Sequence, residues 1–578
     1  MWLFKEFEYA TSALSVYRNC RVLIPIKGLI FPRRDMKKKS IRLTAVFVVI
    51  GSAIAIISAG FSSKPVYVLS TNSAVTIEPI ATTGDVLSGL TVRGIPDGMG
   101  AYKNDRGGIT ILSNHEVAIN DKVALLSASN SSTWGTTITK FNYSPNGKAI
   151  TSAQNLFNNV KFWNYSTGSY QDTPVGAEAK NAAAGTFGWG ISRFCSATFS
   201  PEGTFMFNGI GYEGALFTTG EEVGDSSRGF AFDMNGNGWQ LPRMGMLSFE
   251  TIAPTRKPGI NTVAIANEDG SATDSQLHLY IGKKQSTGSV IDKAGFTNGD
   301  LYVLNAGSIA NDNKFRTTVA KKTPVDVTFN KIEWNTDVTS FAKGARESGM
   351  TFARIEDGEW DPSNPDVYYF ITTESNKDPG ATKESPLEPG VSRDGGALWR
   401  LTFKDAQNPL QGAKLEMLLN GTEAPYLSKP DNLAVTKNGI IMIQEDPGNN
   451  AHIARVVAYQ IATEKMAVVA EFDKQYFTTT GANFMTLDEE SSGIIDVTDL
   501  LAAKGDTNSY FFFNAQVHTY SGVTTVDSGV KGALQPARPD QKVYTKATKT
   551  KLDKQAVEGG QYYRMTISDW NAVFAGTK

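Results

Sequence analysis

Short runs of β-favouring apolar residues, bounded by Gly, Pro, Asn and Asp, recur along the chain, and few stretches have the period of a long helix. Most of these runs end in a carboxylate or an amide, at Glu116, Glu221–Glu222, Glu374, Glu445–Asp446 and Gln516. A further run, QLHLYIGKK, has a basic end, and the irregular spacing of all the runs indicates inserted loops.

This pattern predicts an all-β fold, specifically a six-bladed β-propeller with inserted loops. Each blade would place a strand end at one mouth of a central channel. The last run, GGQYYRMTISDW, is expected to complete a blade that the N-terminal part of the domain begins. A pair of β-sandwiches is the structural alternative.

The N-terminal region has the pattern of an export signal. An apolar run at 41–61 follows the charged stretch RRDMKKKS, and small residues at its end offer a cleavage neighbourhood at 58–63. We therefore expect an export signal region at 1–62 and a single domain at 63–578. The domain would lie in the periplasm or outside the cell.

The signal leaves several alternatives open. Met36 and the lysines after it would begin an ordinary secretory signal, so that 1–35 would be an over-extended start. Arg33-Arg34 instead fits a twin-arginine signal, which exports folded proteins. The apolar run is also about long enough to stay in the membrane as an anchor. If it is cleaved, no stable membrane association is expected.

Composition and charge narrow the chemistry. A formal net charge of −2 gives no electrostatic reason to expect nucleic-acid binding. We also expect the protein to be a monomer. The chain has only four histidines, at 115, 278, 452 and 518. Any metal would therefore need mostly oxygen ligands, which favours hard cations.

The chain has two cysteines, and Cys20 falls in the expected signal region. Cys195, in ISRFCSATFSPEG, then has no partner in the mature chain, although exported proteins normally pair their thiols. It could be a buried small side chain, a metal ligand or a reactive group.

Two acidic segments could bind cations. FARIEDGEWDP, at 352–362, gathers several carboxylates within a few positions. KPDNLAVTKNGIIMIQEDPG, at 429–448, is typical of two strands joined by a tight turn, so that Asp431-Asn432 and Glu445-Asp446 would meet at one end. Buried carboxylates must be neutralised by protons or metal ions, and calcium takes about six to eight oxygens. Solvated surface loops are the alternative.

Five motifs in the same order resemble those of the PhoX family of alkaline phosphatases. They are GISRFCSATFSPEG with GALFTTGEE, ARIEDGEWDP, KPDNLAVTKNGIIMIQED, DEESSGIID and FFFNAQVHT. The match spans the chain from about Gly94 to His518. The resemblance implies a six-bladed propeller with iron and calcium in its central channel, twin-arginine export, and metal-assisted hydrolysis of small phosphate monoesters.

The resemblance also implies roles for individual residues. Arg354 would hold the substrate phosphate, Glu356 would bridge metal ions, and Cys195 would bind iron. The full set of implied metal ligands is Cys195, Glu116, Glu221, Glu222, Glu356, Asp431 and Glu490. Further candidates are His115, which could equally be structural, Asn432, Glu445, Gln516 and His518.

This chain departs from the family pattern at two places. Gly220 stands where the family often has a cysteine, and QVHTYSG replaces its usual QHPG. The second departure leaves the roles of Gln516 and His518 open, and with them the phosphoester that is hydrolysed.

Two other function classes stay open. A calcium-dependent lactonase or esterase on a related propeller would also suit PDNLAV followed by a hairpin, but it would need no thiolate. A non-catalytic, calcium-binding surface propeller would leave Cys195 buried and inert, because a fold alone does not give a function. Iron content separates these classes from a PhoX-like phosphatase.

Overall fold

The structure is a computed structural model, and all of the residues it describes belong to one unit, Pro65–Lys578. The described residues are 66–88, 90–119, 122–124, 132–174, 190–271, 274–373, 394–448, 450–518 and 559–577. The expected export signal, Cys20 and Glu374 lie outside the described residues.

Mostly antiparallel pairing arranges the described strands in five larger sheets and three two-stranded ribbons. One sheet has the order β10 (Ala149–Asn155), β9 (Ile138–Ser144), β6 (Ile109–His115), β5 (Pro96–Lys103). The next has the order β12 (Ser169–Gln171), β11 (Asn159–Asn164), β18 (Asn237–Gln240), β17 (Gly229–Asp233), β16 (Leu216–Glu221), β13 (Phe194–Ser200). The largest, with nine strands, has the order β19 (Phe249–Pro254), β20 (Asn261–Glu268), β21 (Leu277–Lys283), β22 (Asp300–Asn305), β23 (Val325–Ile332), β27 (Ala413–Leu419), β26 (Ala397–Phe403), β25 (Val367–Thr372), β24 (Ile355–Trp360).

Two more sheets complete the set. One has the order β1 (Val68–Ser70), β31 (Lys465–Phe472), β30 (Arg455–Gln460), β29 (Ile440–Glu445), β28 (Pro430–Val435). The other has the order β2 (Val75–Thr82), β34 (Gly559–Ile567), β33 (Ser509–Val517), β32 (Glu489–Asp496). The ribbons are β3 (Val86–Leu87) with β4 (Leu90–Thr91), β7 (Lys122–Ala124) with β8 (Ser132–Trp134), and β14 (Met206–Phe207) with β15 (Ile210–Gly211).

Helices are short and lie in the connections between strands. The α-helices are α4 (Val290–Lys293), α5 (Asp312–Thr318), α6 (Val338–Ser348), α7 (Lys474–Phe477), α8 (Thr498–Leu501) and α10 (Trp570–Phe574). Two 3-10 turns, η2 (Pro242–Met244) and η3 (Pro409–Gln411), begin at prolines. Among the described residues, no helix has the length and apolar character needed to cross a membrane.

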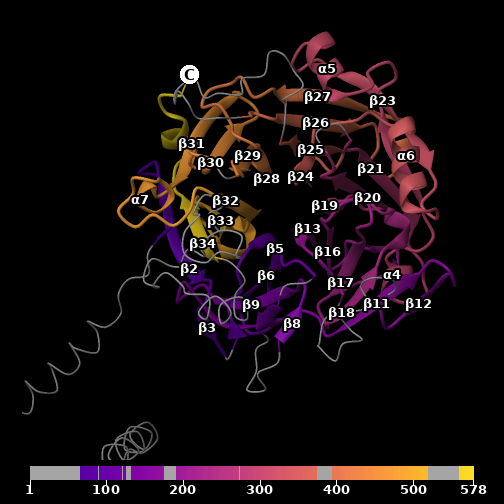
Figure 1. The fold of residues 1–578 in the computed structure, drawn as a ribbon, viewed down its shortest axis with the longest axis horizontal. Helices are drawn as coiled ribbons and strands as arrows, with labels where there is room; N and C mark the ends of the chain where they lie inside the picture. The colour runs from indigo at the N-terminus through magenta and orange to yellow at the C-terminus, as the bar shows by residue number, and fades with distance from the viewer. Residues whose placement is uncertain are drawn as a thin grey trace, which may run out of the picture. The chain divides into compact units, whose positions relative to one another are not determined.

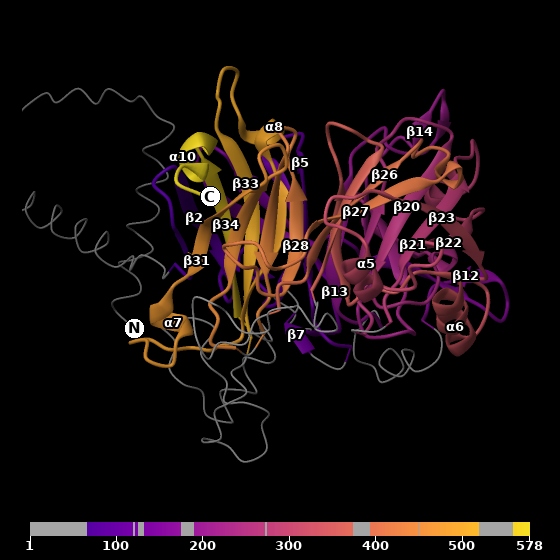
Figure 2. The same cartoon turned by 90° about the horizontal axis from the view of Figure 1, so that it is seen from above.

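The strands that end these sheets on the inside contact one another in a closed ring, in the order β5, β13, β19, β24, β28, β32 and back to β5. Figure 1 views this ring end on, with the labels of the six strands around its centre. Seen from the side, β28 runs along the viewing axis of Figure 1 (Figure 2). The β-propeller prediction is confirmed, and the alternative of two β-sandwiches is wrong.

The hydrophobic core is divided into clusters that lie between successive sheets. For example, Phe511 and Phe513 of β33 share a cluster with Val456 and Ala458 of β30. All nine residues of β33 are buried, because neighbouring sheets cover both of its faces. Such strands are therefore continuous apolar runs without alternation. Each fully buried Phe or Val in them contributes about 1.5–3 kcal/mol.

The two ends of the described chain pair with each other. Strand β2 runs antiparallel to β34, from Val75 opposite Ile567 to Thr82 opposite Gln561. The last strand therefore completes a sheet that the N-terminal part begins, as expected from the sequence. This pairing closes the ring of sheets.

Candidate metal centre

The site is built from two equivalent positions that recur around the ring. The first is the second residue of each innermost strand. These six residues, which we call the inner set, are Asp97, Cys195, Glu250, Glu356, Asp431 and Glu490. The second position is the residue that directly follows the neighbouring strand of the same sheet. These residues, the outer set, are Glu116, Glu222, Asp269, Thr373, Asp446 and His518.

A β-bulge lies at the position of most residues of the inner set. In β5 the register shifts between Pro96 and Met99, which face His115 and Ser113 of β6, so that three steps on one strand oppose two on the other. The same β-bulge follows the first residue of β13, β19, β24 and β28. A bulge re-aims the side chain it contains, and here it contains the inner residue.

The two sets meet in a cavity of about 210 Å³. Ten of the twelve residues line it, all except Asp97 and Thr373, together with Arg193, Arg354, Gly448 and Asp488. A larger cavity of about 430 Å³ is lined by later positions of the same innermost strands, such as Ala197 and Leu433. Its lining contains no cysteine or histidine, so we do not regard it as the metal centre.

Within the described residues, three groups of side chains bring their possible ligand atoms within 4.8 Å of one another. They are Asp97 with Glu116 and Cys195, Cys195 with Glu222 and Glu250, and Glu250 with Glu356 and Asp431. Cys195 and Glu250 each belong to two groups, so they connect the three into one cluster.

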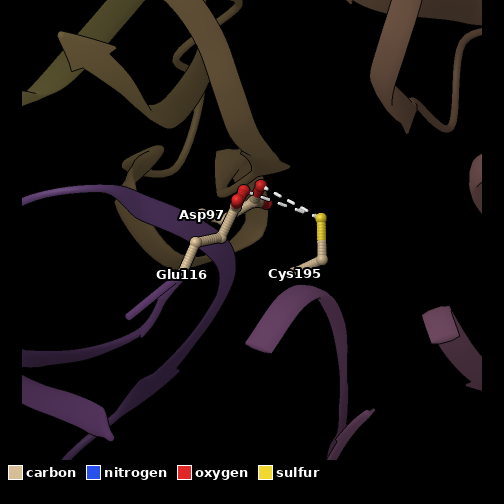
Figure 3. Close-up of side chains that lie close together, drawn as sticks. All are labelled: Asp97, Glu116 and Cys195. Atoms are coloured by element: carbon tan, nitrogen blue, oxygen red, sulfur yellow. Dashed lines mark hydrogen bonds between the residues drawn. The ribbon is translucent and has the colours of Figure 1, made fainter. Parts of the chain in front are cut away.

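The thiol of Cys195 points at two carboxylates. In Figure 3, Asp97, Glu116 and Cys195 turn toward one another from three different strands or strand ends. Cys195 Sγ lies 3.5 Å from Asp97 Oδ2 and 3.7 Å from Glu116 Oε1, and donates to both. Burial and the neighbouring Asp97 raise the pKa of this thiol well above its ordinary value. In the protein without metal the thiol is therefore protonated.

The carboxylates of the cluster are crowded beyond what ionised groups tolerate. Burial, followed by nearby carboxylates, raises the pKa of Asp97, Glu250 and Asp431 well above their ordinary values. Burial raises the pKa of Glu222 to about 8, and burial with Asp446 raises that of Glu490 to about 8. Such a set is neutralised either by protons or by cations.

Glu116 is the exception, because its neighbours lower its pKa by more than burial raises it. Its pKa is lowered by Arg193, with which it forms an ion pair, and by hydrogen bonds from Asp97 and Gln516. Gln516 Nε2 lies 2.8 Å from Glu116 Oε1 and 3.1 Å from Glu490 Oε1. Gln516 therefore holds two of the carboxylates in place.

Buried acceptor atoms without a donor support the presence of a cation. Asp431 Oδ1, Asn432 Oδ1 and Gln516 Oε1 are buried and have no hydrogen-bond partner among the residues that the structure describes. An unsatisfied buried oxygen costs about 1–3 kcal/mol. Oxygen atoms of this kind, with one sulfur, fit hard cations and one position suited to a transition metal.

Asn432 supports the floor of the cluster. Its Nδ2 donates to Ser196 Oγ at 2.7 Å and to Asp97 Oδ1 at 3.3 Å, and Ser196 Oγ in turn donates to Glu250 Oε1 at 2.5 Å. This chain of hydrogen bonds joins two members of the inner set.

The structure brings together most of the residues expected from the sequence. The residues that line the cavity are Glu116, Cys195, Glu222, Arg354, Glu356, Asp431, Glu490 and His518. Gln516 donates to Glu116, and Asn432 donates to Asp97 of the inner set. His518 Nε2 lies 3.4 Å from Glu490 Oε2.

Three expected residues lie elsewhere, and one reason covers them all. His115, Glu221 and Glu445 are the last residues of their strands, one position before the outer set, and successive side chains of a strand point to opposite faces. Glu221 is bound by Arg228 and Glu445 by Arg455. These two glutamates are therefore structural.

His115 is structural as well. Its Nδ1 lies 2.9 Å from Gly94 O and its Nε2 lies 2.8 Å from Thr139 Oγ1. Burial and the nearby Arg93 lower its pKa to about 3, so it is neutral and fully bonded. These contacts favour the structural alternative for His115.

Sequence reasoning missed Asp97, Glu250 and Asp269, together with Arg193 and Asp488. The available signal was positional, since Asp97 and Glu250 each follow the first residue of a strand, as Cys195 does. Asp269 follows a strand end, as Glu222 does.

The neighbours Glu221 and Glu222 give a matched pair for testing this geometry. Glu221→Gln should lower stability by about 3–5 kcal/mol, because it removes the carboxylate charge that balances the buried Arg228, and should leave metal content unchanged. Glu222→Gln should keep the fold and lower metal affinity by at least about 10-fold. Thermal unfolding and elemental analysis check both. Metal loss in the Glu221 variant alone would contradict the assignment of Glu222 to the metal cavity and of Glu221 to the ion pair with Arg228.

The sequence matches the family model of alkaline phosphatase PhoX over residues 178–491, which is more than half of the chain. The chain belongs to the PhoX family of alkaline phosphatases. The matched range holds five of the six inner residues, all except Asp97. Family membership makes the chain a phosphatase-type enzyme, and the resemblance expected from its motifs is confirmed.

One solved structure of a PhoX protein has a similar fold. The structure of Pseudomonas fluorescens PhoX in complex with vanadate aligns with a TM-score of 0.52 at 10% sequence identity, covering 89% of this chain and 99% of that one. A luciferin-regenerating enzyme aligns over 87% and 97% of the two chains at 11% identity, with a TM-score of 0.29. The parainfluenza virus 5 hemagglutinin-neuraminidase ectodomain aligns over 97% and 99% at 8% identity, with a TM-score of 0.30. No curated protein sequence matches the chain.

Proposed function

We propose that this protein is a metal-dependent phosphate monoester hydrolase that acts outside the cytoplasm and releases inorganic phosphate. One observation carries the proposal: a cluster of buried carboxylates and one thiol lies directly beside Arg354 in the same cavity. The metals proposed are calcium and iron, with the thiol of Cys195 at the iron. When bound, such cations neutralise phosphate oxygens and activate water.

Arg354 is the residue proposed to bind the substrate phosphate. Its Nε and Nη2 each donate to Asp269 at 2.8 Å, and Nη2 lies 3.3 Å from Glu356 Oε1. The residue has a φ of 59°, a strained backbone conformation that its packing must maintain. A guanidinium fixed in this way is oriented before the substrate arrives, and its planar fork suits phosphate oxygens.

The carboxylates have a complementary role. Glu356 accepts a hydrogen bond from Thr373, which fixes its orientation in the cluster. Ser196 and Asn432 fix Glu250 and Asp97 in the same way. With ligands held by hydrogen bonds, little reorganisation is needed when charge develops on the phosphoryl group.

We also propose the wider organisation of the protein. The signal would occupy 1–62 and be removed near 58–63, and 63–578 would form a single propeller domain of six blades. Each innermost strand would begin one blade, which divides the nine-stranded sheet into two. The mature protein would be monomeric, periplasmic or extracellular, and free of the membrane, with small phosphomonoesters as substrates.

Metal removal tests the activity directly. The purified mature protein should contain iron and calcium by elemental analysis and should hydrolyse p-nitrophenyl phosphate. Chelation should lower kcat/KM by at least about 100-fold, because cations supply several kcal/mol of transition-state stabilisation, and readdition of metal should restore it. A protein that hydrolyses lactones but not the phosphomonoester, and that contains calcium without iron, would contradict the proposal.

A further inference from the structure

We infer that Arg193 is a second phosphate-binding guanidinium, which works together with Arg354 and favours a phosphate dianion, as in a monoester, over the monoanion of a diester. The inference rests on the proposed function and deepens it. Neither the motif resemblance nor the family match gives Arg193 a role.

The first support is the position of the residue in the repeated architecture. Arg193 directly precedes β13 and lies two residues before Cys195, and Arg354 directly precedes β24 and lies two residues before Glu356. The two arginines therefore hold equivalent places in two of the strands that form the ring. Of the side chains at this place, Arg193, Arg354 and Asp488 line the cavity.

The second support is that the two arginine side chains are more exposed to solvent than the carboxylates they bind. The side chains of Arg193 and Arg354 are 39% and 26% exposed. Their carboxylate partners Glu116, Glu222 and Asp269 are far more buried. The two guanidinium groups are therefore more accessible to a ligand from solvent than the carboxylates that they bind.

The third support is a network that connects the two arginines. Arg193 Nη2 lies 2.8 Å from Glu222 Oε2, Glu222 hydrogen bonds to Asp269, and Asp269 is bound by Arg354. The two carboxylates lie between the two arginines, so each guanidinium is held beside a carboxylate rather than repelled by the other. Both can then remain at one mouth of one cavity.

The fourth support is the unused bonding capacity of Arg193. Its hydrogen bonds, to Glu116 and Glu222, both come from Nη2. The Nε atom is buried and has no hydrogen-bond partner in the part of the chain that the structure describes. A guanidinium can donate five hydrogen bonds, so Arg193 keeps donors for a phosphate oxygen while it holds the two carboxylates.

Charge explains why two arginines are needed. Nine carboxylates line the cavity, namely Glu116, Glu222, Glu250, Asp269, Glu356, Asp431, Asp446, Asp488 and Glu490. Among the described residues, Arg193 and Arg354 are the only arginines or lysines in that lining. Charge-assisted hydrogen bonds from both would contribute most to a ligand that carries two negative charges.

The test compares matched variants in the metal-loaded protein, with inorganic phosphate as the binding probe. Arg193→Gln should weaken phosphate binding, measured by calorimetry, by about 10-fold, which is the loss of one charge-assisted contact. It should also reduce the preference for p-nitrophenyl phosphate over bis(p-nitrophenyl) phosphate by about the same factor. Arg193→Lys, which keeps the charge but lacks the fork, should lie between this variant and the wild type.

Arg256→Gln is the control. Arg256 lines the larger cavity, so its substitution removes the same charge at a place away from the metal centre. It should leave phosphate binding unchanged. Unchanged phosphate affinity and substrate preference in Arg193→Gln, with an active wild type, would overturn the inference alone. A metal-loaded wild type that neither binds phosphate nor hydrolyses the monoester would instead overturn the proposed function.

Metal content, measured in every variant, separates substrate binding from a structural role. If Arg193→Gln loses metal while Arg193→Lys keeps metal and full phosphate affinity, Arg193 only positions Glu116 and Glu222, and the inference fails. If metal is retained and phosphate affinity falls in both variants, the inference stands.

Discussion

Replacing Cys195 with serine should remove iron from the protein and lower phosphatase kcat/KM by at least about 100-fold, since the variant loses a metal ion that stabilises the transition state. Cys195 connects two of the three ligand groups, and among the described residues it supplies the one sulfur atom of the cavity lining. Serine is close in size but its hydroxyl is a poor ligand, whereas the thiol binds as a thiolate once a cation displaces its proton. The fold should survive, because the change creates almost no cavity.

Three measurements check this result. Elemental analysis should show iron lost and calcium largely kept, thermal unfolding of the metal-free variant should match that of the metal-free wild type, and any thiolate-to-iron absorption should disappear. Thr198→Ser, a small change on the same strand but outside the metal cavity, is the control. Normal iron content and turnover in Cys195→Ser would show that the thiol is only a buried small side chain.

The fold was largely predictable, because strands near the centre of the ring, such as β25, β28, β29 and β33, are buried on both faces. Runs such as YFFFNAQ become fully buried strands, so they stand out as apolar segments whatever their neighbours are. The division of the core between successive sheets is less visible, because it depends on contacts between residues far apart in sequence. Phe511 and Val456 share a cluster although no local pattern links them.

The site was predictable to within one residue and no further. The apolar runs located the ends of β16 and β29, but whether Glu221 or Glu222, and Glu445 or Asp446, faces the channel depends on how each strand pairs. The motif match named both Glu221 and Glu222, of which Glu222 lines the cavity, and it named Glu445 where Asp446 lines the cavity.

The residues that the sequence did not indicate are recognised only when the pairing of the strands is known. Asp97 and Glu250 sit inside bulges, and a bulge is defined by the partner strand rather than by the bulged sequence itself. PDG and FET contain a single carboxylate each and resemble ordinary turns or strand starts. Only the sixfold recurrence of the position, seen once the register is known, identifies these carboxylates as members of the same set as Cys195.

Glu250→Gln should change stability and activity in opposite directions. In the metal-free protein, burial and the carboxylate of Glu356 raise the pKa of Glu250 well above its ordinary value of 4.5. The folded state therefore binds a proton that the unfolded state releases, so the stability tied to this group is complete below about pH 4.5 and is lost as the pH rises toward the folded-state pKa. Glutamine is neutral throughout and still accepts the hydrogen bond of Ser196.

We therefore expect the metal-free Glu250→Gln protein to be more stable than the metal-free wild type at pH 7, by about 1–3 kcal/mol, and equally stable near pH 4. With metal present the sign reverses: the variant loses a ligand shared by two groups, so its metal affinity should fall by at least about 10-fold and its activity with it. Thermal midpoints at both pH values, with and without metal, measure the reversal.

Glu445→Gln is the matched control for this reversal. Glu445 is also buried, but Arg455 and His452 outweigh the effect of burial and lower its pKa to about 2. Its ionised form stabilises the fold above about pH 4.5, so the substitution should destabilise the protein at pH 7 and leave metal binding intact. If both variants were destabilised without metal, burial and mutual repulsion would not be destabilising the ionised carboxylates of the cluster. The argument for a cation that neutralises them would then fail.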